Sequence, residues 1–103
     1  MGPLSLLWIK MPIGLLTLEI HLPEAHSLKE KRRVVRKIKD RLRARFNVAV
    51  AELDHQDIWQ RALLGVVSLA SDEKAVERLL EAVEHELEKM VGGALIATER
   101  TVF

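Results

Sequence analysis

The sequence predicts a small α+β domain in which strands and helices follow one another in the order βαββαβ. Three observations lead to this prediction. At 103 residues the chain has room for one hydrophobic core. Two long segments repeat apolar residues at the period of a helix, and the segments around them have the alternation or the short apolar runs of strands. Proline, glycine and capping residues separate these segments.

The first half of the chain is expected to form a strand and then a helix. Residues 13–22 alternate apolar side chains with others, and Pro23 ends the strand because proline has no backbone N–H to donate. Ser27 opens a helix over residues 27–45, because Ser27 and Glu30 form an S-x-x-E capping box. The apolar stripe of this helix consists of Leu28, Val35, Ile38 and Leu42, with Val34 beside them.

The second half is expected to form two strands, a helix and a final strand. Residues 47–53 and 61–70 are the strands, and the Ser-Asp pair at 71–72 supplies the cap of the helix. The buried stripe of that helix consists of Val76, Leu79, Leu80, Val83, Leu87 and Met90. The Gly-Gly pair at 92–93 ends the helix, and residues 94–103 form the last strand.

This order of elements is typical of the ferredoxin-like sandwich, an antiparallel four-stranded sheet with two helices on one face. Right-handed crossovers give the spatial strand order 4-1-3-2, with strands one and three in the centre. We expect a single domain over residues 13–103. Residues 1–12 are expected to be a flexible N-terminal extension, since their apolar run is far shorter than a membrane span and lacks the features of a signal peptide.

Composition and motif spacing argue against catalysis. The chain has no cysteine, which excludes disulfides and thiol chemistry and suits a cytoplasmic location. It has no Gly-rich phosphate loop and no nucleophile signature. The carboxylates Glu52, Asp54 and Asp57 could hold Mg²⁺ or could simply form a polar turn between two strands. We expect no enzyme activity, no catalytic residues and no cofactor.

Three histidines raise the alternative of a metal site, because imidazole is a common ligand. His21 and His26 follow the first strand, and His55 follows the second. We expect the ends of these two strands at opposite ends of the sheet. The three side chains would then not converge, so we predict no metal site.

The helix at residues 27–45 is strongly basic although the whole chain has a net charge of only +1. It holds ten Lys and Arg against two acids, which gives +8, whereas residues 72–91 hold seven acids against three basic residues, which gives −4. Like charges at i,i+4 repel weakly, and the helix N-terminus attracts phosphate, so the helix favours an anionic partner. The predicted nucleic-acid contacts are Lys29, Lys31, Arg32, Arg33, Arg36, Lys37 and Arg43.

Three alternatives stay open for this basic helix. It can bind RNA or another polyanion, it can be a solvated face partly neutralised by the acidic second helix, or it can bind an acidic protein or anionic membrane. A membrane partner is not expected, because the apolar stripe is needed for the core. The central strands contain no Phe, Tyr or Trp, so base stacking on the sheet is not expected, and RNA would be held through its phosphates. A non-enzymatic module or homo-oligomer acting through the open sheet face or an edge strand is the other function considered.

The connection before the third strand is a further candidate site for a partner or for structural contacts. It contains Asp57, Trp59, Gln60 and Arg61. A tryptophan in a connection either anchors a ligand or partner, or closes the end of the core, and the second role is the commoner one.

Three stretches of the chain resemble the YlxP-like family (DUF503) of short bacterial proteins. They are A-H-S-L-K-E-K-R-R-V-V from Ala25, F-N-V-A-V-A-E-L-D-H-Q-D from Phe46 and W-Q-R-A-L-L-G from Trp59. The resemblance covers residues 13–103 and implies a ferredoxin-like fold. The genes of the family commonly lie among those for transcription and translation factors, which implies a role with RNA or the ribosome, and no residue carries over with a catalytic role.

Overall fold

The structure is a computed structural model that describes residues 12–54 and 58–103. Its elements are β1 (Ile13–His21), α1 (Leu28–Arg45), β2 (Ala49–Asp54), β3 (Arg61–Leu69), α2 (Glu73–Val91), a 3₁₀ turn (Gly92–Ala94) and β4 (Leu95–Val102). The predicted order βαββαβ is therefore confirmed, with strand ends that differ from the prediction by one or two residues. The predicted N-terminal extension lies almost entirely outside the described residues.

The four strands form one antiparallel sheet in the order β2-β3-β1-β4. This is the predicted order 4-1-3-2 read from the other edge, with β1 and β3 in the centre. Both β1 and β2 pair antiparallel with β3, so they run parallel to each other and end at the same end of the sheet. The positions of the loops that follow β1 and β2 depend on this relation.

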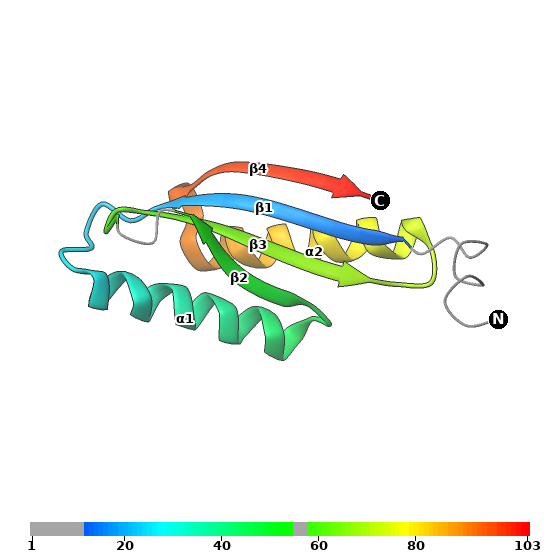
Figure 1. The fold of residues 1–103 in the computed structure, drawn as a ribbon, viewed down its shortest axis with the longest axis horizontal. Helices are drawn as coiled ribbons and strands as arrows, with labels where there is room; N and C mark the ends of the chain where they lie inside the picture. The colour runs from blue at the N-terminus through cyan, green and yellow to red at the C-terminus, as the bar shows by residue number, and fades with distance from the viewer. Residues whose placement is uncertain (1–11, 55–57) are drawn as a thin grey trace.

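Both helices cover the same face of the sheet (Figure 1). Leu16, Leu18 and Ile20 of β1 point toward them and are essentially inaccessible to solvent. The other buried members of the core come from α1, β2, β3 and α2, and they are Val35, Ile38, Leu42, Val50, Ala62, Leu64, Val66, Val76, Leu80, Val83 and Leu87. Removing large side chains such as these from water stabilises the fold by about 1.5–3 kcal/mol each.

Capping contacts determine where the helices begin and end. The Ser27 Oγ accepts the Glu30 backbone N–H at 3.1 Å, as predicted, whereas the Glu30 carboxylate accepts the N–H of His26 at 2.7 Å, one residue before the cap. Asp72 caps α2 by accepting the Ala75 N–H at 2.9 Å. Gly92 ends α2 with a φ of 54°, a conformation that favours glycine.

A glycine in β1 allows α2 to approach the sheet closely. A Cβ added to Gly14 would collide with Cγ1 of Val76 and lie 2.9 Å from Cδ1 of Leu80. A Cβ added to Gly65 of β3 would instead meet the flexible end of the Leu53 side chain, also at 2.9 Å. The β-branched Val76 has little rotamer freedom in a helix, so it cannot turn aside as Leu53 can.

We therefore expect Gly14→Ala to lower the free energy of unfolding by about 1–3 kcal/mol, because α2 must shift away from β1. Gly65→Ala is the matched control and should change it by less than about 1 kcal/mol. Urea unfolding followed by circular dichroism measures both values. Equal losses for the two variants would contradict this account of the α2 packing.

Candidate nucleic-acid interface

One side of α1 packs under the sheet and includes a lysine. Lys31, Val35, Ile38 and Leu42 are buried and follow one another at spacings of four, three and four residues, which places them on one stripe. The predicted apolar stripe lacked Lys31. The structure thus gives a charged residue a core position on the basic helix.

The Lys31 ammonium pairs with a carboxylate on the sheet. Its Nζ lies 2.8 Å from Oε2 of Glu52 on β2, and the two side chains are 1% and 18% exposed. A charge in this position is stable only because it is paired. Lys31 is one of the predicted nucleic-acid contacts, and its burial beneath β2 keeps it from reaching an external phosphate. Glu52, considered as a metal ligand from sequence, is occupied by this ion pair.

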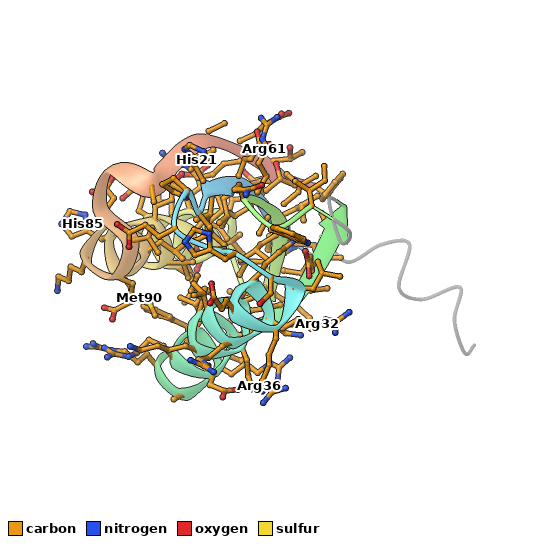
Figure 2. All side chains as sticks on the ribbon, turned by 90° about the vertical axis from the view of Figure 1, so that its left-hand side faces the viewer. His21, Arg32, Arg36, Arg61, His85 and Met90 are labelled. Carbon is orange, nitrogen blue, oxygen red and sulfur yellow. The ribbon has the colours of Figure 1, made fainter. Side chains whose placement is uncertain are left out.

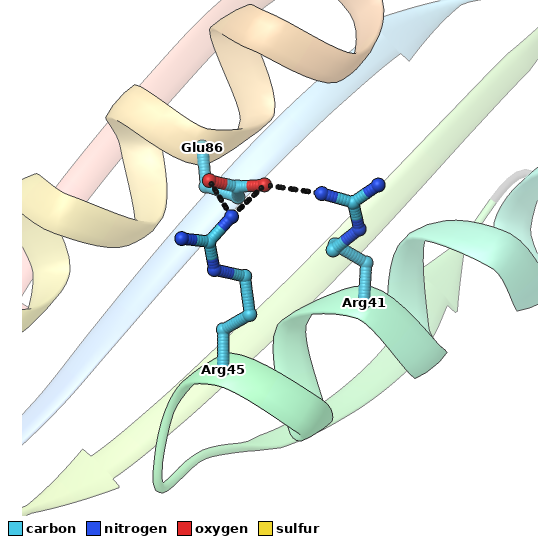
Figure 3. A network of polar contacts seen from close by, with 3 residues as sticks. All are labelled: Arg41, Arg45 and Glu86. Atoms are coloured by element: carbon cyan, nitrogen blue, oxygen red, sulfur yellow. Dashed lines mark hydrogen bonds and ion pairs between the residues drawn. The ribbon is translucent and has the colours of Figure 1, made fainter.

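A second side of α1 faces α2, where a glutamate binds two arginines (Figure 3). Nη1 of Arg41 lies 3.0 Å from Oε2 of Glu86, and Nη1 of Arg45 lies 3.2 Å from Oε1. Glu86 is only 5% exposed, whereas both arginines remain about half exposed. The acidic helix therefore neutralises part of the basic one, as the solvated-face alternative anticipated.

A third side of α1 carries basic residues that point outward. Arg32, Arg36, Lys39 and Arg43 again follow spacings of four, three and four residues, and Figure 2 shows Arg32 and Arg36 projecting away from the domain. They line a groove of about 420 Å³ between α1 and β2, together with Val35, Asp40 and Glu52. No ion pair joins these four side chains to another residue in the described part of the chain.

The outer basic surface, as we call it, adds to this groove the exposed basic side chains on the solvent-facing side of α1, of which Lys37 also borders the side toward α2. Its members are Lys29, Arg32, Arg33, Arg36, Lys37, Lys39 and Arg43. Six of them were predicted contacts, and Lys39 was missed although its place between Arg36 and Arg43 at spacings of three and four was visible in the sequence. From Lys29 to Arg43 the surface extends about 21 Å along the helix axis.

The N-terminus of α1 contributes less to this surface than expected. Ser27 already accepts one of the backbone N–H groups of the first turn, and the Glu30 carboxylate stands within that turn. A negative charge there repels a phosphate approaching the helix end. The exposed side chains, not the capped helix end, are the candidate contacts.

Hydrogen bonds of Gln60, and not its neighbour Trp59, hold the start of β3 to the loop after β1. Trp59 is 45% exposed, so the prediction that it closes the core was wrong. Gln60 instead joins the two loops at this end of the sheet. Its carbonyl accepts the Leu22 N–H at 2.7 Å, and its side-chain amide donates to the Ala25 carbonyl at 3.4 Å.

Arg61 forms an ion pair with Glu19, with an Nη2–Oε1 distance of 2.7 Å across the two central strands. It lies on the sheet face away from the helices, where Figure 2 also places His21. Asp57, the remaining residue of this predicted group, lies outside the described residues.

The prediction that the first two strands end at opposite ends of the sheet, which kept the three histidines apart, was wrong. Because β1 and β2 run parallel, Asp54 at the end of β2 lies at the same end of the sheet as His21. His55 lies outside the described residues. Within residues 12–54 and 58–103, no three His, Asp or Glu side chains are grouped so that they could hold a metal ion.

The length and apolar content of the described helices show whether any of them could span a membrane. None of them is long and apolar enough to cross a membrane.

Fold and surface together define a ferredoxin-like α+β domain with a basic helix packed on one face of its sheet. The chain belongs to the family described as "Protein of unknown function (DUF503)", whose model matches residues 13–100. It is 38% identical over 71 residues to the "Uncharacterized protein YlxP" of Bacillus subtilis (strain 168), an alignment that covers 69% of this chain and 77% of the relative. The predicted YlxP-like resemblance is confirmed.

Similar solved structures confirm the fold. The de novo designed protein Foldit4 has a TM-score of 0.60 at 15% identity, covering 91% of this chain and 97% of the design. A second de novo design, described as having a ferredoxin fold, has a TM-score of 0.54 at 13% identity and covers 90% and 85% of the two chains. At such low identity these likenesses concern the fold alone.

Breaking the Lys31–Glu52 pair should destabilise the domain strongly. Lys31→Met leaves the Glu52 carboxylate without its cation, and we expect a loss of about 3 kcal/mol in the free energy of unfolding. Combining Lys31→Met with Glu52→Leu should recover most of that loss, because neither charge is then buried. A double-mutant cycle by urea unfolding measures the coupling, and additive losses would refute it.

Proposed function

We propose that this chain is a non-enzymatic, cytoplasmic RNA- or ribosome-associated binding protein that holds phosphates on the outer basic surface of α1. The observation that supports this most is the groove beside β2. Arg32, Arg36, Lys39 and Arg43 converge on it without an ion-pair partner among the described residues.

The spacing of these four residues makes an anionic ligand favourable. Each is three or four positions from the next, so neighbouring charges repel by a few tenths of a kcal/mol per pair. A phosphate between two of them turns this repulsion into two charge-assisted contacts. Arginine suits that role, because its guanidinium binds phosphate oxygens in a bidentate manner.

The side chains of the sheet indicate how the proposed RNA partner would be recognised. The central strands β1 and β3 contain no Phe, Tyr or Trp on which a base could stack, and their one ring side chain is the imidazole of His21 at the end of β1. The proposed binding therefore uses phosphate positions and the shape of a folded RNA, with little readout of sequence. It agrees with the RNA or ribosome role that the family resemblance implies.

The test compares RNA affinity across salt concentrations. The triple variant Arg32→Gln, Arg36→Gln, Arg43→Gln should bind a structured RNA at least about tenfold more weakly at low salt. The slope of log K against log salt concentration should fall by about 2 to 3, because about three fewer counterions are released. Fluorescence anisotropy with a labelled hairpin RNA measures both quantities.

A matched control removes the same charge from the other helix. Lys74→Gln, Arg78→Gln, Lys89→Gln changes three exposed basic residues of α2 and should leave the salt slope within about 1 of the parent. Equal effects of the two triples would reduce the binding to net charge alone and refute the proposed surface. Undetectable binding of the parent chain at low salt would also refute it.

A further inference from the structure

The sheet face opposite the helices carries large apolar side chains that no described element covers. Ile13, Val67 and Leu69 are 37%, 41% and 57% exposed. Leu53 of β2, 50% exposed, lies over Gly65 on the same face. Phe103, 65% exposed, donates its backbone N–H to the Ile13 carbonyl and adds an aromatic at that edge. Apolar patches of this extent on a small protein commonly mark an interaction surface.

The apolar residues and the charged residues of this face lie at different ends of the strands. Ile13 lies opposite Leu69 and Leu15 opposite Val67, so one end of the central strand pair is apolar. The other end holds the Glu19–Arg61 ion pair, with the carboxylate on β1 and the guanidinium on β3. Figure 2 shows Arg61 on the side of the sheet away from α1.

We infer that this face binds a second copy of the chain, with a two-fold axis parallel to the strands and between β1 and β3. That axis places β1 of one copy over β3 of the other. Ile13 then meets Leu69 of the second copy, and Leu15 meets its Val67. At the polar end, Glu19 lies over Leu63 of the second copy, and Arg61 of that copy, two residues along β3, is its diagonal neighbour. The face is therefore complementary to itself in charge as well as in apolar character.

The size of the face suits a weak, specific dimer. Four strands about 4.8 Å apart and up to nine residues long outline roughly 500 Å². Two copies together contribute about twice this outline. The relief of the side chains raises the accessible area further, toward the lower end of the roughly 1,200–2,000 Å² that specific interfaces bury in total over both partners. We expect a dissociation constant of about 1–100 µM.

The charge distribution permits this arrangement and disfavours contact through the helices. In the dimer the two helix layers lie on the outside, separated by two sheets, and the outer basic surfaces are further apart than the Debye length of about 8 Å. Packing through α1 would instead bring two sets of unpaired cations together. The proposed dimer does not depend on RNA binding, because the open sheet face and the outer basic surface of α1 lie on opposite sides of the sheet.

Sedimentation velocity of the full chain over a range of concentrations tests the dimer. A reversible monomer–dimer equilibrium is expected for the parent. Ile13→Glu and Leu69→Lys should each raise the dissociation constant at least about 30-fold, because each buries two uncompensated charges in a symmetric interface. Circular dichroism confirms that each variant is folded, and Val67→Glu gives a second variant if one of them is not.

Mixing the two variants tests the proposed axis. Ile13→Glu in one copy should face Leu69→Lys in the other, so the mixture should form a heterodimer although neither variant dimerises alone. Native mass spectrometry distinguishes the heterodimer from the homodimers by mass. A mixture that remains monomeric would overturn the proposed register.

Two further variants test whether α2 or the N-terminal segment takes part in the dimer. Ala82→Glu, which adds an acidic charge on the exposed side of α2, should leave the dissociation constant unchanged. A chain without residues 1–10 should dimerise as the full chain does. A parent that is monomeric at all concentrations overturns the inference. If only the shortened chain dimerises, the proposal also fails, because the N-terminal segment then covers the face.

Discussion

The packing of one buried stripe under the sheet, made of Lys31, Val35, Ile38 and Leu42, determines how the basic helix is rotated about its own axis. With the ammonium 2.8 Å from a carboxylate on β2, Lys31 must point under the sheet. Since residues four and three positions apart share one side of a helix, Val35, Ile38 and Leu42 follow it into the core. The directions of all other side chains on α1 follow from this rotation.

That rotation divides the basic residues of α1 according to what they contact. Arg41 and Arg45 turn toward α2, where Glu86 binds both. The side toward the β2 edge keeps Arg32, Arg36, Lys39 and Arg43 around a groove. The +8 of the segment is therefore not a uniform charge. Part of it stabilises the packing of α1 on the sheet and on α2, and the remainder faces outward.

Periodicity in the sequence was sufficient to predict the order of the elements, the strand order and most of the core. It was insufficient for Lys31, because lysine is rarely buried, so a basic residue within a basic helix was assigned to the surface. The gap of seven residues between Leu28 and Val35 left a place for it on the buried stripe. Its partner, Glu52, is 21 positions away, and local patterns do not reveal such a pairing.

Two other differences have physical causes of the same kind. Trp59 was expected to close the core because that is the commoner role of a tryptophan in a connection, yet hydrogen bonds of Gln60 hold the loops at that end and the indole is exposed. The strands β1 and β2 were expected to end at opposite ends of the sheet, which would have kept the histidines apart. A helix that crosses over between two strands of one sheet joins them in parallel, and the pairing of both with β3 shows this directly.

The arrangement of helices on one face alone gives the two sides of the sheet different chemistry. On the covered side, burial requires each charge to be paired, as Lys31 and Glu86 show. On the open side, Ile13, Val67 and Leu69 remain in contact with solvent at a cost that a second apolar layer would remove. The proposed dimer supplies that layer without using the outer basic surface. Each copy could then hold RNA while paired, and the dimer would present two phosphate-binding surfaces facing opposite directions.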